Sequence, residues 1–231
     1  MCFSASASFG AGVVLSVIGV ASIKKVRSPS QNAFASIPLI FALQQITEGF
    51  VWLSFTHASF AFVQEASTYI FLFFAQIIWP IWVPYSILIL KKKEKRQKIE
   101  KLLVGVGGVV SLYLAYCLWC YPVEAKAIGY HISYSQHYPS QFSLYGGVLY
   151  IIATIVPPFF SNIKRMWALG TAILISYIIT AIFYEAYIIS VWCFFASVIS
   201  IAVYAVMHRI KTSDEFTKKG KYKHQIIAPI I

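Results

Sequence analysis

The chain of 231 residues is too apolar and too weakly charged to be a soluble globular domain. Apolar residues make up 59% of it and charged residues 12%, with a mean hydropathy of +0.71, whereas about 25% of an ordinary soluble domain is charged. Its 19 basic and 8 acidic side chains cannot cover a soluble surface. This composition excludes a cytosolic enzyme, a disordered region, a disulfide-stapled secreted module and a nucleic-acid-binding domain. It indicates that lipid surrounds the chain.

Seven apolar runs are long enough to cross a bilayer as helices, for which about 20 mostly apolar residues are needed. The sequence therefore predicts an all-α, polytopic membrane protein with seven transmembrane helices. The predicted spans are residues 3–23, 34–55, 66–90, 102–121, 142–160, 167–184 and 187–207. Only Glu185 and Ala186 separate the sixth run from the seventh, which predicts a tight antiparallel hairpin.

The basic residues predict the orientation of these spans, because short cytoplasmic loops are enriched in Lys and Arg. Clusters follow the first, third, fifth and seventh runs, so this threading places 18 of the 19 basic residues on one side and only Lys126 on the other. Six or eight spans would separate the clusters. We therefore expect the N-terminus outside and the C-terminus inside. The first run has no basic stretch before it, which favours an uncleaved anchor over a signal peptide.

The chain divides into a predicted transmembrane domain, residues 1–207, and a basic cytoplasmic tail, residues 208–231. We expect it in the cell (plasma or inner) membrane as a multi-pass protein. Its net charge of +11 predicts contact with membrane lipids, since cytoplasmic basic clusters attract anionic headgroups. Nucleic acid is not an expected partner, because no suitable fold or aromatic platform accompanies the charge. The long external loop, residues 122–141, is expected to fold over the outer mouth.

The second span carries a carboxyl group inside the predicted hydrocarbon zone. Glu48 lies about seven residues, or roughly 10 Å, from the outer end of the span. Gln44 and Gln45 precede it, and Gln44 lies one turn away on the same helix face. Ionisable groups within spans usually mark functional sites. Two interpretations remain open: a site residue, or a protonated or hydrogen-bonded carboxyl that holds helices together.

Other polar groups lie near the middle or in the outer half of the spans. Gln76 lies near the middle of the third span, followed by Pro80 and Pro84, which predict a kink and freed backbone carbonyls. Small polar residues also recur at helical spacing on the sixth and seventh spans, where packing alone explains them well. They are Ser176, Thr180, Ser190, Cys193, Ser197 and Ser200.

The four cysteines all fall on the outer side or in the outer half. Cys117 and Cys120 form a C-x-x-C, which is either a redox pair or, more often in a helix, two small buried hydrophobes. Cys2 would become the N-terminal residue if Met1 were removed, and could then act as a nucleophile beside an amine. Cys193 lies in the outer half of the seventh span. Among the external histidines, His131 lies in an amphipathic stretch that could dip into the mouth.

Several familiar chemistries are excluded by the absence of their residues. The seventh span contains no Lys for a retinal Schiff base, and the only Asp, Asp214, lies in the tail. The zinc-protease, nucleophile-elbow and phosphate-loop motifs are all missing. The sequence identifies no metal-ligand set and leaves the cofactor unknown.

Three segments of the chain resemble an uncharacterised family. They are MCFSASASF at residues 1–9, FALQQITEG at residues 41–49 and SVWCFFA at residues 190–196. Together they resemble bacterial integral membrane proteins that begin MCFSA and are classed as a domain of unknown function. The resemblance extends over the whole chain. It implies a seven-helix bacterial membrane protein and supplies no activity.

These observations predict an outward-facing intramembrane pocket that binds a small molecule, a lipid or a metal ion. Glu48 would be its proton-accepting or ligating group. An intramembrane enzyme acting on lipid, acyl or thiol substrates is the first alternative, with Cys2 or Cys193 as nucleophile and Glu48 or His131 as base. A transporter is the second, and a purely structural protein also remains open. The predicted lining is Gln44, Gln45, Glu48, Gln76, His131, Glu185, Trp192 and Cys193.

Overall fold

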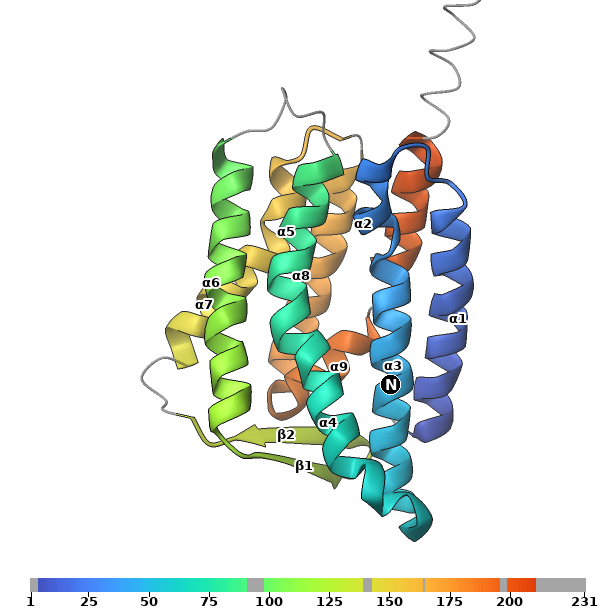
Figure 1. The fold of residues 1–231 in the computed structure, drawn as a ribbon, viewed down its shortest axis with the longest axis vertical. Helices are drawn as coiled ribbons and strands as arrows, with labels where there is room; N and C mark the ends of the chain where they lie inside the picture. The colour runs from blue at the N-terminus through green and yellow to red at the C-terminus, as the bar shows by residue number, and fades with distance from the viewer. Residues whose placement is uncertain (1–3, 91–97, 139–142, 164, 196–198, 211–231) are drawn as a thin grey trace, which may run out of the picture.

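A computed structural model describes residues 4–90, 98–138, 143–163, 165–195 and 199–210, which form a helical bundle (Figure 1). Its α-helices are α1 (Ala5–Ile23), α2 (Asn32–Ala35), α3 (Ile37–Thr56), α4 (Gln64–Leu72), α5 (Trp79–Leu90), α6 (Lys98–Cys120), α7 (Ser143–Ile155), α8 (Met166–Phe183), α9 (Ile188–Phe194) and a further helix, Ile199–Ile210. The 3-10 segments are η1 (Pro29–Gln31), η2 (Ala58–Val63), η6 (Pro157–Phe160) and η7 (Glu185–Tyr187). A π-helical segment, η3 (Phe73–Ile78), joins α4 to α5.

Five helical stretches among the described residues are long and apolar enough to cross a membrane. They overlap the first, second, third, fourth and sixth predicted spans. The other two predicted spans contain shorter helices: α7 in the fifth, and α9 with Ile199–Ile210 in the seventh. The part of the chain that the structure describes is therefore mostly helical, with five candidate membrane spans. Those five are Ala5–Ile23, Pro29–Thr56, Ala58–Leu90, Lys98–Cys120 and Met166–Phe183.

A two-stranded hairpin lies across one end of the bundle, which we call the hairpin end (Figure 1). Strands β1 (Val123–Ile128) and β2 (His131–Gln136) pair antiparallel, with Ile128 opposite His131 at the turn. Gly129 has a φ of 58° in this turn, a left-handed conformation that glycine adopts without steric cost. Ala125 and Ile132 are buried against α3. The predicted external loop thus contains a β-hairpin that the sequence analysis did not foresee.

The connection between α8 and α9 is as short as the sequence predicted. Helix α8 ends at Phe183, the 3-10 turn η7 occupies Glu185–Tyr187, and α9 begins at Ile188. The predicted break at Glu185 and Ala186 is therefore confirmed. Further along, the helix that begins at Ile199 runs to Ile210, and the rest of the predicted tail lies outside the described residues.

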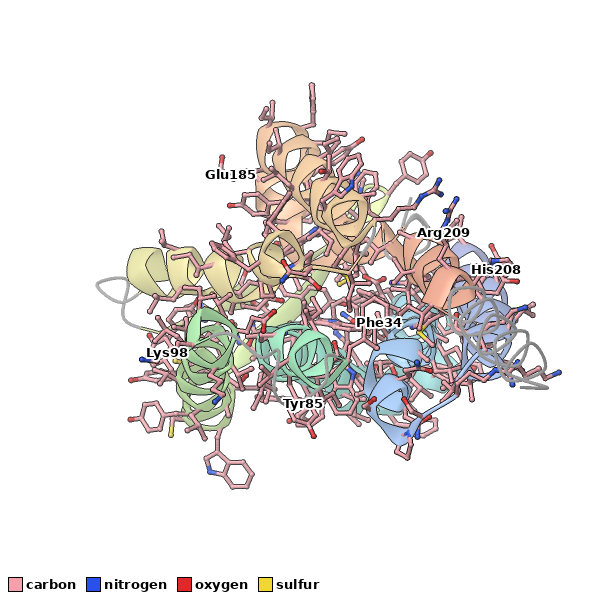
Figure 2. All side chains as sticks on the ribbon, turned by 90° about the horizontal axis from the view of Figure 1, so that it is seen from above. Phe34, Tyr85, Lys98, Glu185, His208 and Arg209 are labelled. Carbon is pink, nitrogen blue, oxygen red and sulfur yellow. The ribbon has the colours of Figure 1, made fainter. Side chains whose placement is uncertain are left out.

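Most described basic residues lie at the end of the bundle opposite the hairpin. Figure 2 views the molecule from this end and labels Lys98 and Arg209 on two of the helices that reach it. Lys126 is the exception among the described Lys and Arg residues, because it lies on β1 and pairs with Glu124 at 2.9 Å. The others are Lys24, Lys25, Arg27, Lys98, Lys101, Arg165 and Arg209.

Small residues let α1 and α3 pack closely. A Cβ added at Gly12 would lie 2.7 Å from Ile46 Cγ1, and one added at Gly49 would lie 2.8 Å from the Phe9 ring. Ser8 is also buried on α1. Small residues on α1 therefore serve the packing of these two helices. Phe34, on α2, is fully buried and lies near the centre of the bundle (Figure 2).

The third predicted span is interrupted by the π-helical segment η3. The Tyr150 hydroxyl donates to the Ala75 carbonyl at 2.5 Å, and the Ser111 hydroxyl donates to the Ile77 carbonyl at 2.7 Å. Pro80 lacks the N–H that would reach back into this segment. Side chains from α6 and α7 therefore bind two backbone carbonyls of this segment, and the kink and freed carbonyls expected at Pro80 and Pro84 stay a prediction.

Candidate functional site

Glu48 is fully buried on α3 and is bound by side chains from two elements. Ser190 Oγ, on α9, donates to Glu48 Oε1 at 2.7 Å. Gln45 Nε2, on α3 itself, donates to Glu48 Oε2 at 3.4 Å. All three residues are at most 1% exposed. The carboxyl group therefore joins α3 to α9 inside the bundle.

Gln44 forms a second link between buried helices. Its Oε1 accepts from Trp79 Nε1 of α5 at 2.7 Å, and its Nε2 donates to Cys193 Sγ of α9 at 2.9 Å. The Trp79 ring is stacked on Phe41, with centroids 3.8 Å apart. Four of the predicted site residues, Gln44, Gln45, Glu48 and Cys193, thus lie in one buried region between α3 and α9.

Gln76 and Trp192 bind partners outside this region. The side-chain amides of Gln76 and Gln136 form two reciprocal hydrogen bonds, at 2.7 and 3.2 Å, which tie η3 to the end of β2. Trp192 Nε1 donates to Ser176 Oγ of α8 at 3.0 Å. Both residues therefore hold neighbouring elements together.

His131 and Glu185 lie at the hairpin end of the bundle. The His131 ring is stacked on Tyr187, with centroids 4.7 Å apart, and lies edge-on to Tyr184 at 5.3 Å. Glu185 is exposed, and Figure 2 shows it at the edge of the bundle. Cys2 lies outside the described residues. The functional roles of these residues stay predictions.

A cavity of about 300 Å³ lies beside the Gln44 region, among α3, η3, α5, α6, α7, α8, α9 and the helix that begins at Ile199. Gln76, Trp192 and Cys193 of the predicted set line it. Gln44, Gln45, Glu48, His131 and Glu185 are not among its lining residues. The walls add aromatic and hydroxyl side chains that the sequence analysis missed: Trp79, Tyr113, Tyr138, Tyr150, Thr154 and Tyr177.

Most polar groups of the cavity wall already have hydrogen-bond partners within the protein. The indole N–H groups of Trp79 and Trp192 donate to Gln44 and Ser176. The Tyr150 hydroxyl donates to a backbone carbonyl, and Thr154 Oγ1 donates to the Tyr150 carbonyl at 2.8 Å. The cavity surface is therefore mainly apolar and aromatic. The available sequence signal was tyrosine in the interior of spans, since tyrosine is otherwise enriched at membrane interfaces.

The described residues offer little for a metal ion or a disulfide. No group of three or more His, Cys, Asp and Glu side chains that could hold a metal occurs within the described ranges. Cys117, Cys120 and Cys193 are free thiols, with Cys117 buried and Cys120 exposed. Cys117 and Cys120 are therefore not joined to each other in this structure.

We expect Ser190→Ala to lower the free energy of unfolding by about 1–3 kcal/mol, because a buried carboxyl group loses a hydrogen-bond donor. SDS titration of the purified protein in mixed micelles measures this change. Ser200→Ala is the matched control. Ser200 is also fully buried, but its hydroxyl has no hydrogen-bond partner among the described residues. Equal losses in the two variants would show that the Ser190–Glu48 bond contributes nothing.

We expect the hairpin to pack less stably as the pH falls, because burial lowers the pKa of His131 from its ordinary value of 6.5. Below pH 6.5 the unfolded chain binds a proton more readily than the folded one, so stability declines as the pH falls from 6.5 towards the folded pKa. The thermal midpoints at pH 8 and pH 5.5 measure this. His131→Phe keeps a ring at this position and should show a smaller pH dependence. An unchanged dependence in the variant would assign the effect to other groups.

Comparison with known proteins places the chain in a family without assigning it an activity. No match was found among curated proteins, and none among solved structures. A family model, described as a family of unknown function, matches residues 1–218. Because the match covers nearly the whole chain, this protein belongs to the family of unknown function DUF6629.

Proposed function

We propose that this protein spans the cell membrane seven times, with its N-terminus outside, and binds a lipid-like hydrophobic ligand in the cavity between its helices. The orientation is supported by the described basic residues. Apart from Lys126, they lie at the end opposite the hairpin, which the positive-inside rule assigns to the cytoplasm. Helix α7 with η6, and α9 with Ile199–Ile210, would supply the fifth and seventh spans.

The observation that carries the ligand proposal is the cavity of about 300 Å³ with an apolar and aromatic wall. This volume is at the lower end of the range of ligand pockets, about 300–1,000 Å³. A strongly polar ligand would lose its hydrogen bonds to water without replacement, because most polar wall groups are already bound within the protein. A hydrocarbon chain has no such bonds to lose. The surrounding bilayer would supply such a ligand at high concentration.

Tryptophan fluorescence tests this proposal, because Trp79 and Trp192 line the cavity. The probe is a ten-carbon alcohol that carries bromine on its chain. We expect it to quench the tryptophan fluorescence of the purified protein in nanodiscs, and part of this quenching should saturate as the probe concentration rises. Trp79→Phe/Trp192→Phe should lose that component. It should keep the non-saturable quenching of Trp119 and Trp167, which are 91% and 63% exposed. Absence of any saturable component would contradict the proposal.

A cavity-filling variant gives an independent test. Gly147 lines the cavity, and a Cβ added there meets nothing within 4 Å. We expect Gly147→Phe to fold and to lower the saturable quenching at least tenfold. Gly108→Phe is the matched control, because Gly108 also meets nothing within 4 Å and does not line the cavity. Equal binding by the two variants would place the ligand elsewhere.

A further inference from the structure

We infer that the ligand is an uncharged amphiphile, whose carbonyl or hydroxyl head lies beside Gln76 near the hairpin end and whose apolar tail extends towards the opposite end. This inference rests on the proposed function and specifies its ligand class and orientation. It is carried by three observations: the unequal distribution of polar groups along the cavity, the hydrogen-bonding capacity left at Gln76, and the absence of charge from the described lining.

The two halves of the cavity differ in polarity. Val83 lies farther from the hairpin end than Gln76, by a distance of about 10 Å along the axis of η3 and α5. The half near the hairpin contains five hydrogen-bonding side chains, Gln76, Tyr113, Tyr138, Tyr150 and Cys193, beside the hydrocarbon side chains of Leu114, Ile188 and Ile189. The opposite half is lined by hydrocarbon side chains: Ile37, Phe41, Val83, Leu169, Ile199 and Val203. Thr154 also lies towards that half, but its hydroxyl is bound to its own helix.

Gln76 can bind a further polar group while its pair with Gln136 stays intact. A primary amide offers two N–H donors and two acceptor lone pairs. The reciprocal bonds to Gln136 use one donor and one acceptor of Gln76, which leaves one of each. Gln76 is only 7% exposed and lines the cavity. A carbonyl would accept from the remaining N–H, and a hydroxyl would either accept from that N–H or donate to the remaining lone pair.

Among the described residues, the cavity wall offers no charged partner for an ionic head. None of the described residues that line the cavity is Asp, Glu, Lys, Arg or His. Burial of an unpaired charge in an apolar wall is strongly unfavourable. Carboxylate, phosphate and quaternary ammonium heads are therefore disfavoured relative to an alcohol or a glycerol ester of the same chain length.

Competition among probes of equal chain length tests the head group. In this assay, decanol or 1-decanoylglycerol is added to nanodiscs that contain the brominated alcohol, at matched mole fractions. Displacement of the brominated alcohol is measured as a loss of the saturable quenching. We expect each to compete at least tenfold more strongly than decanoate at pH 8 or decyltrimethylammonium. Equal competition by either charged probe would overturn the inference.

Gln76→Leu tests the residue assigned to the head. We expect it to weaken decanol binding three- to tenfold, the loss of about one hydrogen bond, and to leave the binding of decane unchanged. If the variant lost equal affinity for decanol and for decane, Gln76 would not recognise the head group. The wild-type probe series needs no variant, so it tests the inference even if Gln76→Leu does not fold.

A photoreactive decanol with a diazirine at the end of its tail tests the orientation. We expect peptide mass spectrometry to find the label near Leu169 and Val203, at the far end of the cavity. Labelling near Gln76 or Tyr113 would reverse the orientation. If no probe gives saturable quenching, the proposed function itself fails. If quenching saturates but the charged probes compete equally, only the inference about the ligand class fails.

Discussion

Gly107→Ala is expected to lower the free energy of unfolding by about 1–3 kcal/mol, as overpacking of a close contact does. Gly107 lies on α6 against the backbone of α5, and an added Cβ would overlap the Pro80 carbonyl oxygen. A backbone atom cannot rotate away as a side chain can, so the two helices would have to separate. Pro84 has no N–H to bond the Pro80 carbonyl, which stays accessible to α6.

Gly108→Ala is the matched control for this prediction. Gly108 is the next residue on α6, and a Cβ added there meets nothing within 4 Å. Alanine favours the helix over glycine by about 0.5–1 kcal/mol, so this variant is expected to be unchanged or slightly more stable. SDS titration of both variants measures the difference. If Gly107→Ala were as stable as Gly108→Ala, the result would contradict the close contact described between α5 and α6.

Gln44→Leu is expected to destabilise the protein by about 1–3 kcal/mol, because it leaves the buried indole N–H of Trp79 without its acceptor. It also removes the donor to Cys193, so the hydrogen bonds of Gln44 to both α5 and α9 are lost. Leucine is close to glutamine in size, so the loss reports hydrogen bonding more than packing. The free energy of unfolding is again measured by SDS titration.

A double-mutant cycle separates the Gln44–Trp79 bond from other effects. With Trp79→Phe already present, Gln44→Leu leaves no indole N–H without a partner. We expect the double variant to be less destabilised than the sum of the single variants by about 0.5–3 kcal/mol, the range for directly contacting residues. Additive losses would show that the two side chains are not coupled.

The sequence predicted the helical architecture because hydrophobic length is a strong local signal. Five predicted spans coincide with long apolar helices, and the break at Glu185 and Ala186 lies where it was expected. The hairpin of β1 and β2 was missed. Its pairing depends on Ala125 and Ile132 packing against Val51 and Trp52 of α3, a tertiary contact that the loop's own composition does not reveal.

The candidate site was predicted in part. The buried polar groups of α3 were recognisable as costly residues inside a span, and their spacing brought Gln44 and Glu48 to one face of the helix. Which helices supply their partners was not predictable, because Ser190 and Trp79 lie on other segments. A pocket was predicted, but most of its wall was not, because the wall combines residues from eight helical segments and no single segment shows the space between them.

The π-helical segment η3 links the order of synthesis to the stability of the third predicted span. The carbonyls of Ala75 and Ile77 accept from Tyr150 and Ser111, which the ribosome makes only after this span is complete. In the proposed seven-span arrangement, those bonds cannot form until α6 and α7 enter the bilayer, and a carbonyl without a partner is costly in hydrocarbon. The span Ala58–Leu90 should therefore leave the insertion machinery late, held there until the helices that complete its backbone arrive.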